Sequence, residues 1–177
     1  MCGIIGINSN KPVSSSIINS LKKLEYRGYD SAGIATLSSG LINEIKSEGR
    51  VDNLEKNSLV KNMQGTIGIG HVRWATHGSP NSINAHPHSS QNASVVHNGI
   101  IENSTLLKKF LVGKGHVFKS QTDTEVIVHL ITENLKKDEL EKAITKTLKQ
   151  LHGSFALGIV FKDIPDLIIG ARRGSPL

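Results

Sequence analysis

A single cysteine near the start of the chain is the most clearly reactive residue in the sequence. Cys2 is the only cysteine among 177 residues, and it stands between Met1 and Gly3. Its small side chain permits aminopeptidases to remove Met1, which would place a thiol and a free α-amine on one residue. A structural role is the alternative, because MCGIIGI has the apolar character of a β-strand and cysteine buries well. Cys2 is therefore either a catalytic thiol or a core residue.

Two polar segments contain further side chains that could bind a ligand or take part in a reaction. The segment YRGYDSAG (26–33) places Arg27 and Asp30 among tyrosines and glycines, although it could be a simple turn in which these two residues pair. The segment GHVRWATHG (70–78) contains Arg73, whose planar guanidinium matches a carboxylate, and Trp74, the only tryptophan. Because glycines flank it, this loop could close over a ligand and exclude water. An exposed loop with a packed tryptophan is the alternative.

A third segment, VVHNGIIEN (95–103), contains an Asn98–Gly99 pair between apolar residues. This dipeptide is typical of a type I′ turn, so a β-hairpin is one interpretation. An asparagine amide is also a neutral hydrogen-bond donor, and a glycine lets its backbone N–H approach a reacting atom closely. Such a pair could form an oxyanion hole beside a nucleophile. The segment alone leaves both interpretations open.

Five histidines lie between positions 71 and 97 and raise the question of a metal site: His71, His77, His86, His88 and His97. They do not follow a recognised zinc-ligand spacing, and the only cysteine of the chain is far away in the sequence. We therefore expect no metal ion and no other cofactor.

The composition argues against several classes of function. The formal net charge is +6, but the lysines are scattered and there are only one Trp, two Tyr and four Phe to stack on bases. Apolar runs are too short for a membrane span, and the amino terminus lacks the features of a signal peptide. A lone cysteine forms no internal disulfide, which suits a reducing compartment. We expect one cytoplasmic domain (1–177) that binds neither nucleic acid nor a membrane.

Strands and helices must bring these groups together. Apolar runs with β-branched residues predict strands at Cys2–Asn8, Ser31–Ser38, Leu41–Ser47, Thr66–Val72, Ser94–His97, Ser154–Phe161 and Asp166–Ala171. Helical spacing of apolar residues predicts helices around 17–24, 126–131 and 140–151. Thr122 with Glu125, and Asp138 with Glu141, have the spacing of capping boxes. Because strands and helices do not alternate one for one, two antiparallel sheets covered by helices are favoured over a doubly wound parallel sheet.

Taken in order, the motifs resemble those of a known family. The amino-terminal CGI is followed by EYRGYDSAG, RWATHG, NAHPH, HNGIIEN, TDTEV and a closing GSPL. This ordered set is similar to the glutamine amidotransferase type 2, or glutaminase, domain of glucosamine-6-phosphate synthase, the isomerising glutamine–fructose-6-phosphate aminotransferase. The related amidophosphoribosyltransferases share CGI and Asn-Gly but not RWATHG with NAHPH. The resemblance covers the chain from Cys2 to Leu177.

The resemblance implies both a fold and a mechanism. The fold would be α+β, the four-layer αββα sandwich of N-terminal-nucleophile hydrolases with two antiparallel sheets. Cys2 would attack the side-chain amide of glutamine, with its own α-amine as the base, and form a thioester as ammonia leaves. Ordinary pKa values of about 8.5 for a thiol and about 7.7–8.0 for an α-amine permit this proton exchange near neutral pH.

The resemblance also assigns roles to the other site residues. Asn98 and the Gly99 N–H would hold the oxyanion. Arg73 would bind the α-carboxylate of glutamine, and Asp123 would bind its α-ammonium group. Thr76 and His77 would complete the pocket. Trp74 would lie on the loop that closes it, and Arg27 would help to organise its wall.

The same resemblance defines the expected substrates and partners. L-Glutamine would bind to this chain, whereas fructose 6-phosphate would bind only to a sugar-phosphate isomerase region that the 177 residues do not include. The full-length enzyme is expected to be a homo-oligomer that uses the ammonia to make glucosamine 6-phosphate. Two alternatives remain, namely a class II glutaminase domain that serves another acceptor and a non-catalytic module that binds glutamine.

Overall fold

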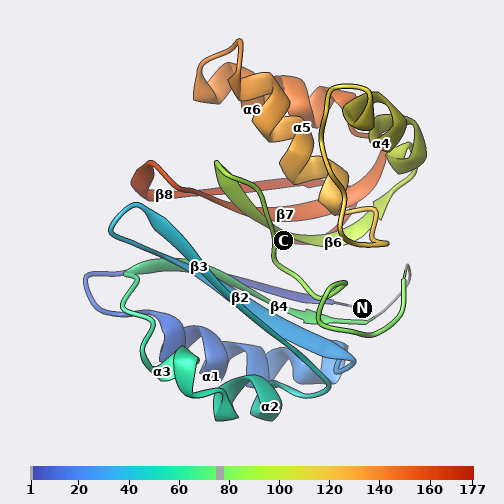
Figure 1. The fold of residues 1–177 in the computed structure, drawn as a ribbon. Coiled ribbons are helices and arrows are strands. Elements are labelled where there is room, and N and C mark those ends of the chain that lie inside the picture. The colour runs from blue at the N-terminus through green and yellow to red at the C-terminus, as the bar shows by residue number, and fades with distance from the viewer. Residues whose placement is uncertain (1, 75–77) are drawn as a thin grey trace.

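The computed structural model describes residues 2–74 and 78–177. Two antiparallel four-stranded sheets face each other in the middle of the molecule, and helices cover the outer face of each sheet (Figure 1). The layers therefore run in the order helices, sheet, sheet, helices, which confirms the αββα sandwich expected from the sequence.

The amino-terminal part of the chain forms the first sheet. Its strands stand in the order β1-β4-β2-β3, with the bounds β1 Gly3–Asn8, β2 Ser31–Ser38, β3 Leu41–Glu48 and β4 Ile67–Arg73. The helices on its outer face are α1 (Ser14–Leu24), α2 (Val51–Lys56) and α3 (Ser58–Lys61), and a 3-10 turn at Glu25–Arg27 follows α1. β4 is buried along its whole length because strands flank both of its edges and other layers cover both of its faces.

The carboxyl-terminal part of the chain forms the second sheet. Its strands stand in the order β5-β6-β7-β8, with the bounds β5 His88–Ser89, β6 Ala93–Ile101, β7 Gly153–Phe161 and β8 Ile164–Arg173. Its outer helices are α4 (Ser104–Val112), α5 (Glu125–Leu135) and α6 (Leu140–Gln150). α5 is buried around most of its circumference because it packs against the sheet and both neighbouring helices.

Apolar side chains join the facing surfaces of the two sheets: Ala35, Leu37, Ile67, Ile69, Val96 and Val160. On the outer face of the first sheet, α1 approaches β4 so closely that a Cβ at Gly70 would lie 2.4 Å from Ile17 Cγ2. Because β1 and β4 are antiparallel, Gly3 at the start of β1 lies opposite Val72 near the end of β4. This register brings Cys2 close to the segment that leaves β4.

All the strands expected from the sequence are present, although several ends differ. β6 (Ala93–Ile101) and β8 extend beyond the predicted Ser94–His97 and Asp166–Ala171. β6 continues through Asn98 and Gly99, both of which pair with β7, so the hairpin interpretation of this dipeptide is wrong. Pairing along the whole of β7 keeps the chain extended where the local signal favours a turn. The sequence pattern did not predict β5, α2, α3 or α4, which have between two and nine residues.

The predicted capping box at Thr122 and Glu125 is wrong. α5 begins at Glu125, and Thr124 occupies the N-cap position. The Glu125 carboxylate instead accepts hydrogen bonds from the backbone N–H groups of Lys119 and Ser120, at 2.9 and 2.7 Å. These N–H groups belong to an irregular segment and need an acceptor, which the carboxylate supplies.

The predicted pairing of Asp138 with Glu141 at the start of α6 is also wrong. The residue at the N-cap of α6 is Glu139, and its side chain makes no capping hydrogen bond. Asp138 forms ion pairs with Lys142 at 2.7 Å and with Lys146 at 3.1 Å. The carboxylate thus binds lysines one and two turns into the helix instead of backbone donors.

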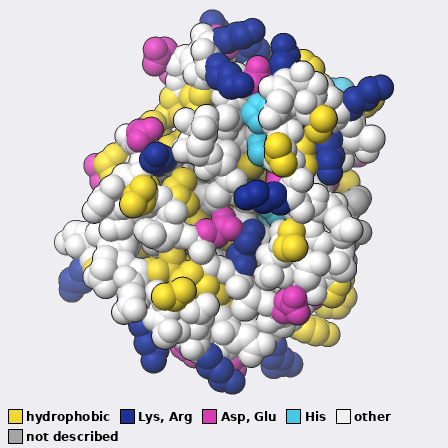
Figure 2. All heavy atoms as spheres, viewed as in Figure 1, with side chains coloured by type: hydrophobic (Ala, Val, Ile, Leu, Met, Phe, Trp, Pro, Cys, Tyr) yellow, Lys and Arg dark blue, Asp and Glu magenta, His cyan; other side chains and the backbone are white. Residues whose placement is uncertain are grey.

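Two further features of the molecule are the character of its helices and the distribution of its basic side chains. In the part of the chain that the structure describes, the helices lack the length and apolar character that crossing a bilayer requires. Lysine and arginine side chains are spread over the face shown in Figure 2 and do not gather into one patch there.

Candidate active site

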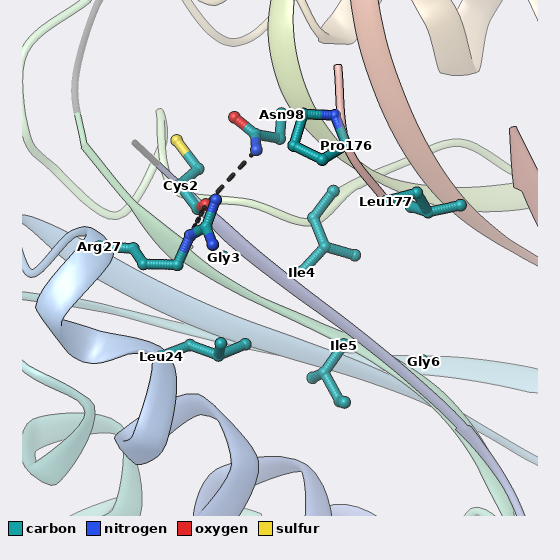
Figure 3. Close-up of a pocket in the computed structure, with 10 residues that line it drawn as sticks. All are labelled: Cys2, Gly3, Ile4, Ile5, Gly6, Leu24, Arg27, Asn98, Pro176 and Leu177. Carbon is teal, nitrogen blue, oxygen red and sulfur yellow. Dashed lines mark hydrogen bonds between the residues drawn. The ribbon is translucent and has the colours of Figure 1, made fainter. Parts of the chain in front are cut away.

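Cys2 directly precedes β1 and is held from two sides. Arg27 Nε donates a hydrogen bond to the Cys2 carbonyl oxygen at 3.1 Å, and the Asn98 side-chain amide donates to the same oxygen at 3.4 Å (Figure 3). Arg27 follows α1 beneath the first sheet, whereas Asn98 belongs to β6 of the second sheet. Both residues also line a cavity of about 400 Å³ whose other walls are mainly apolar. Cys2 is thus fixed between the two sheets.

The thiol of Cys2 contacts the backbone of Trp74. The Trp74 N–H donates to Sγ at 3.4 Å, and Sγ lies 3.7 Å from the Trp74 carbonyl oxygen. Burial raises the pKa of the Cys2 thiol above its ordinary value, although the Trp74 N–H and the nearby charge of Arg73 lower it in part. A thiol that stays protonated at pH 7 needs a base before it can act as a nucleophile.

A small void beside Cys2 brings most of the predicted site residues together. Its volume is about 20 Å³, and its lining includes Cys2, Arg73, Trp74, Gly99 and Asp123. A void of this size accommodates about one water molecule. Two predicted residues, Thr76 and His77, lie outside the described residues, as does Met1.

Arg73 ends β4 and is almost fully buried, with 3% of its surface exposed. Its guanidinium donates to the carbonyl oxygen of Ser79 at 3.2 Å and to that of Gly78 at 3.4 Å. Nη1 also lies 3.8 Å from Asp30 Oδ1. The predicted pairing of Asp30 with Arg27 is not observed, because Arg27 bonds to Cys2 and the Asp30 carboxylate lies near Arg73. These contacts orient a cation toward the void.

Asp123 lines the same void as Arg73 and precedes α5. Its side chain is buried, and its Oδ2 accepts a hydrogen bond from the Ile101 backbone N–H at 2.7 Å. Ile101 is the last residue of β6, so this bond ties the segment before α5 to the strand that carries Asn98. A buried carboxylate and a buried guanidinium thus line the same small void.

Gly99 is required by the packing of β6 against β7. Its φ is +137°, and a Cβ at this position would lie 2.1 Å from the Ser154 carbonyl oxygen. The glycine therefore has a structural reason for its place as well as the chemical one expected from the sequence. Asn98, one residue earlier, already directs its amide N–H toward the Cys2 main chain. The two residues form the wall of the site on the side of the second sheet.

Four buried histidines form a cluster at the void, and two of them, His86 and His97, line it: His71, His86, His88 and His97. The rings of His71 and His86 are stacked at 4.2 Å, and Thr124 Oγ1 lies 2.8 Å from His86 Nε2 and 2.8 Å from His97 Nδ1. Among the described residues, the structure shows no group of three or more histidine, cysteine or acidic residues arranged to hold a metal ion. These rings serve as hydrogen-bonding elements of the core.

The buried histidines predict acid-sensitive stability. Burial lowers the pKa of His71 and of His88 from 6.5 to about 3, so both rings are neutral in the folded protein at pH 5. The unfolded chain binds protons at these positions below about pH 6.5, so the free energy of unfolding falls as pH drops from 6.5 toward 3. Each histidine contributes a slope of up to about 1.4 kcal/mol per pH unit. Urea unfolding at pH 7.0, 6.0 and 5.0 measures this loss.

The variant His88→Gln should show a shallower pH dependence between pH 6.5 and 5.0 than the parent. His152→Gln is the matched control, because it replaces an exposed histidine by the same residue. Equal stability of the parent at pH 7.0 and pH 5.0 would contradict the prediction.

Sequence reasoning missed several residues that shape the site. Thr124 bridges two histidines, and Glu125 binds the loop before α5, although both stand in the TDTEV motif. Asn84, in the NAHPH motif, is buried and hydrogen-bonded to Ser79 and Gln121. A buried asparagine beside two histidines was a signal for a polar network, but the partners of that network are distant in the sequence.

The fold and these side chains define a class of protein. Residues 71–173 match the family described as the glutamine amidotransferase domain, and the chain belongs to this family. The family resemblance predicted from the sequence motifs is thereby confirmed.

Two proteins of known name are similar to this chain along its whole length. The isomerising glutamine–fructose-6-phosphate aminotransferase of Mesorhizobium japonicum is 52% identical over the whole of this chain, which covers 29% of that protein. The protein of the same name from Zymomonas mobilis is 50% identical, again over the whole chain and 29% of the relative. This chain therefore spans less than a third of the length of these relatives.

Solved structures show the same fold. The glutamine phosphoribosylpyrophosphate amidotransferase of B. subtilis is 29% identical and has a TM-score of 0.77 over 92% of this chain and 35% of its own. A glutamine aminotransferase class-II domain protein from Silicibacter pomeroyi has a TM-score of 0.69 over 99% of this chain and 78% of its own. That structure is 12% identical, so it supports the fold alone.

Proposed function

We propose that this chain hydrolyses the side-chain amide of L-glutamine, with Cys2 as the nucleophile. The observation that carries the proposal is the void beside Cys2, which a buried cation, Arg73, and a buried anion, Asp123, also line. Glutamine has an α-carboxylate and an α-ammonium group that complement these two charges. Membership of the glutamine amidotransferase family supports the same reaction.

The proposed chemistry begins after removal of Met1. The free α-amine of Cys2 takes the thiol proton, and Sγ attacks the amide carbon of glutamine to form a tetrahedral intermediate. The C–N bond then breaks, the proton returns to the leaving nitrogen, and ammonia departs from a γ-glutamyl thioester. Water, deprotonated by the same amine, hydrolyses the thioester to glutamate and restores the thiol. The raised pKa of the thiol explains why a base is needed.

Two groups of β6 would stabilise the oxyanion of both tetrahedral intermediates. The Asn98 amide is a neutral donor next to the Cys2 main chain, and Gly99 lines the void beside the thiol. Donors that are already in place cost little reorganisation when negative charge develops on the oxygen. Arg27 would support this geometry from the other side by holding the Cys2 carbonyl oxygen.

The remaining residues would bind and enclose glutamine. The guanidinium of Arg73 presents a planar set of donors to a carboxylate, and Asp123 pairs with an ammonium group. Trp74 is about half exposed at the mouth of the void and stacks edge-on against Tyr29 at 5.7 Å. We propose that Thr76 and His77 complete the pocket and that Trp74 lies on the loop that closes it over the substrate.

We further infer that the ammonia aminates fructose 6-phosphate in a longer protein. The names of the Mesorhizobium and Zymomonas relatives, which are about half identical to this chain, support this acceptor. The sugar phosphate would bind in a region beyond these 177 residues. A homo-oligomeric assembly, a cytoplasmic location and the lack of nucleic-acid binding stay predictions.

An ammonia assay tests the proposal directly. With Met1 removed, the chain should convert glutamine to equimolar ammonia and glutamate, and should make no amino sugar when fructose 6-phosphate is added. Cys2→Ala should release no ammonia while it keeps the parent's unfolding midpoint. Glutamine that stays intact with the processed parent chain would contradict the glutaminase function, and an amino sugar would contradict the division between the two regions.

A further inference from the structure

Two separate segments carry the charged residues of the site. Arg73 ends β4 and is bound by the carbonyl oxygens of Gly78 and Ser79. Asp123 belongs to the irregular segment that precedes α5. A ligand with both an α-carboxylate and an α-ammonium group must reach both charges at once. The distance between these two segments therefore matters for binding.

The side chain of Asn84 connects the two segments. Its Nδ2 donates to the Ser79 carbonyl oxygen at 3.0 Å and to Gln121 Oε1 at 3.2 Å. Its Oδ1 accepts from the Gln121 backbone N–H at 2.9 Å. The Ser79 carbonyl oxygen also accepts from Arg73, and Gln121 stands two residues before Asp123. One amide thus binds a partner of Arg73 and a near neighbour of Asp123.

Asn84, at the centre of the bridge, is buried and closely packed. Asn84 is 1% exposed, and both of its amide hydrogens and its oxygen have the described partners. A Cβ at Gly78 would lie 2.7 Å from Asn84 Nδ2, so the Arg73 segment rests directly on the amide. The Ser79 N–H adds a longer contact of 3.4 Å to Gln121 Oε1. Loss of the Asn84 amide would remove three hydrogen bonds that join the two segments.

We propose that Asn84 is a positioning residue that sets the separation of Arg73 and Asp123 and so selects ligands that carry both an α-carboxylate and an α-ammonium group. The inference rests on the proposed glutaminase function. Asn84 makes no described contact with Cys2, Asn98 or Gly99, so the chemical step should depend on it little.

Kinetics of Asn84→Ala test the proposal. The variant should raise the KM for glutamine roughly tenfold to a hundredfold, because several hydrogen bonds of the bridge are lost, while kcat changes less than about threefold. Gln121→Ala removes the exposed side chain that accepts a hydrogen bond from Asn84 Nδ2, so this variant should also raise the KM. Asn134→Ala is the matched control, since Asn134 is a buried asparagine that joins α5 to α6. It should lower stability without raising KM.

A ligand series separates positioning from general destabilisation. The parent should bind L-glutamate more tightly than glutarate, which lacks the α-amine, in calorimetric titrations. In Asn84→Ala the ratio of the two affinities should shrink, because one ligand no longer reaches both charges well. The proposal would be overturned if Asn84→Ala keeps both the parent's ratio of affinities and its KM. It would also be overturned if the variant loses affinity for both ligands by the same factor. If the processed parent hydrolyses no glutamine, the proposed function fails and this inference fails with it.

Discussion

A chain that retains Met1 is expected to fold normally and to lose nearly all glutaminase turnover. With Met1 attached, the nitrogen of Cys2 is a peptide amide, which accepts no proton near neutral pH. The thiol would remain, but burial raises its pKa, so few molecules would carry a thiolate at pH 7. General-base catalysis typically contributes about 10²–10⁴ in rate, and the loss should fall in that range or exceed it.

Intact-mass spectrometry beside an ammonia assay measures this effect. Preparations with and without Met1 should have the same unfolding midpoint but differ in turnover, and removal of Met1 by an aminopeptidase should restore activity. A glutamine-like electrophile should then label Cys2 in the processed chain only. Full activity in a sample whose mass includes Met1 would rule out the α-amine as the base. His71, His77 and His97 would then be the candidate bases, and His97 lines the same void as Cys2.

Asn98→Ala should lower kcat by about 10²–10³, because one oxyanion donor is typically worth this factor. The KM for glutamine should change much less, since the donor acts mainly on charge that develops in the transition state. The structure supports this expectation by placing Asn98 inside β6, with its amide directed toward the Cys2 main chain. Steady-state kinetics of ammonia release provide the measurement.

Asn103→Ala is the matched control for Asn98→Ala. Asn103 follows the same strand but bonds to the Gln150 carbonyl oxygen and the His152 backbone N–H, away from Cys2. This control should lower stability and keep its turnover. If Asn98→Ala keeps the parent kcat and loses only stability, the oxyanion role is wrong and Asn98 is a structural residue of the strand.

Local sequence was enough to predict the fold class and most strands. Alternating and β-branched apolar runs mark β1, β2 and β4 because these strands pack on both faces, and that burial requires apolar side chains. The type of chemistry also followed from local sequence, since a lone Cys2 behind Met1 and an Asn98–Gly99 pair limit the reactions available. The ordered motifs then indicated the glutamine amidotransferase family, which the match to residues 71–173 confirms.

The hairpin failed because pairing with a distant strand overrode the local propensity, and the two capping boxes failed because each carboxylate binds other donors nearby in the sequence. Asn98–Gly99 favours a turn in isolation, but pairing with β7 along the whole of β6 holds it extended. Glu125 has the spacing of a capping residue, but its carboxylate accepts hydrogen bonds from the backbone N–H groups of Lys119 and Ser120 instead. Spacing alone does not determine which of several nearby donors a carboxylate binds.

Only the tertiary structure decided which of the polar residues meet. Cys2 and Asn98 are 96 positions apart, and they meet because β1 and β6 belong to facing sheets that pack through an apolar core. The bridge of Asn84 between the segments of Arg73 and Asp123 arises in the same way, from hydrogen bonds across 5 and 37 positions. A buried amide must find partners wherever the packed chain supplies them, so its role depends on the three-dimensional arrangement and not on the neighbouring sequence.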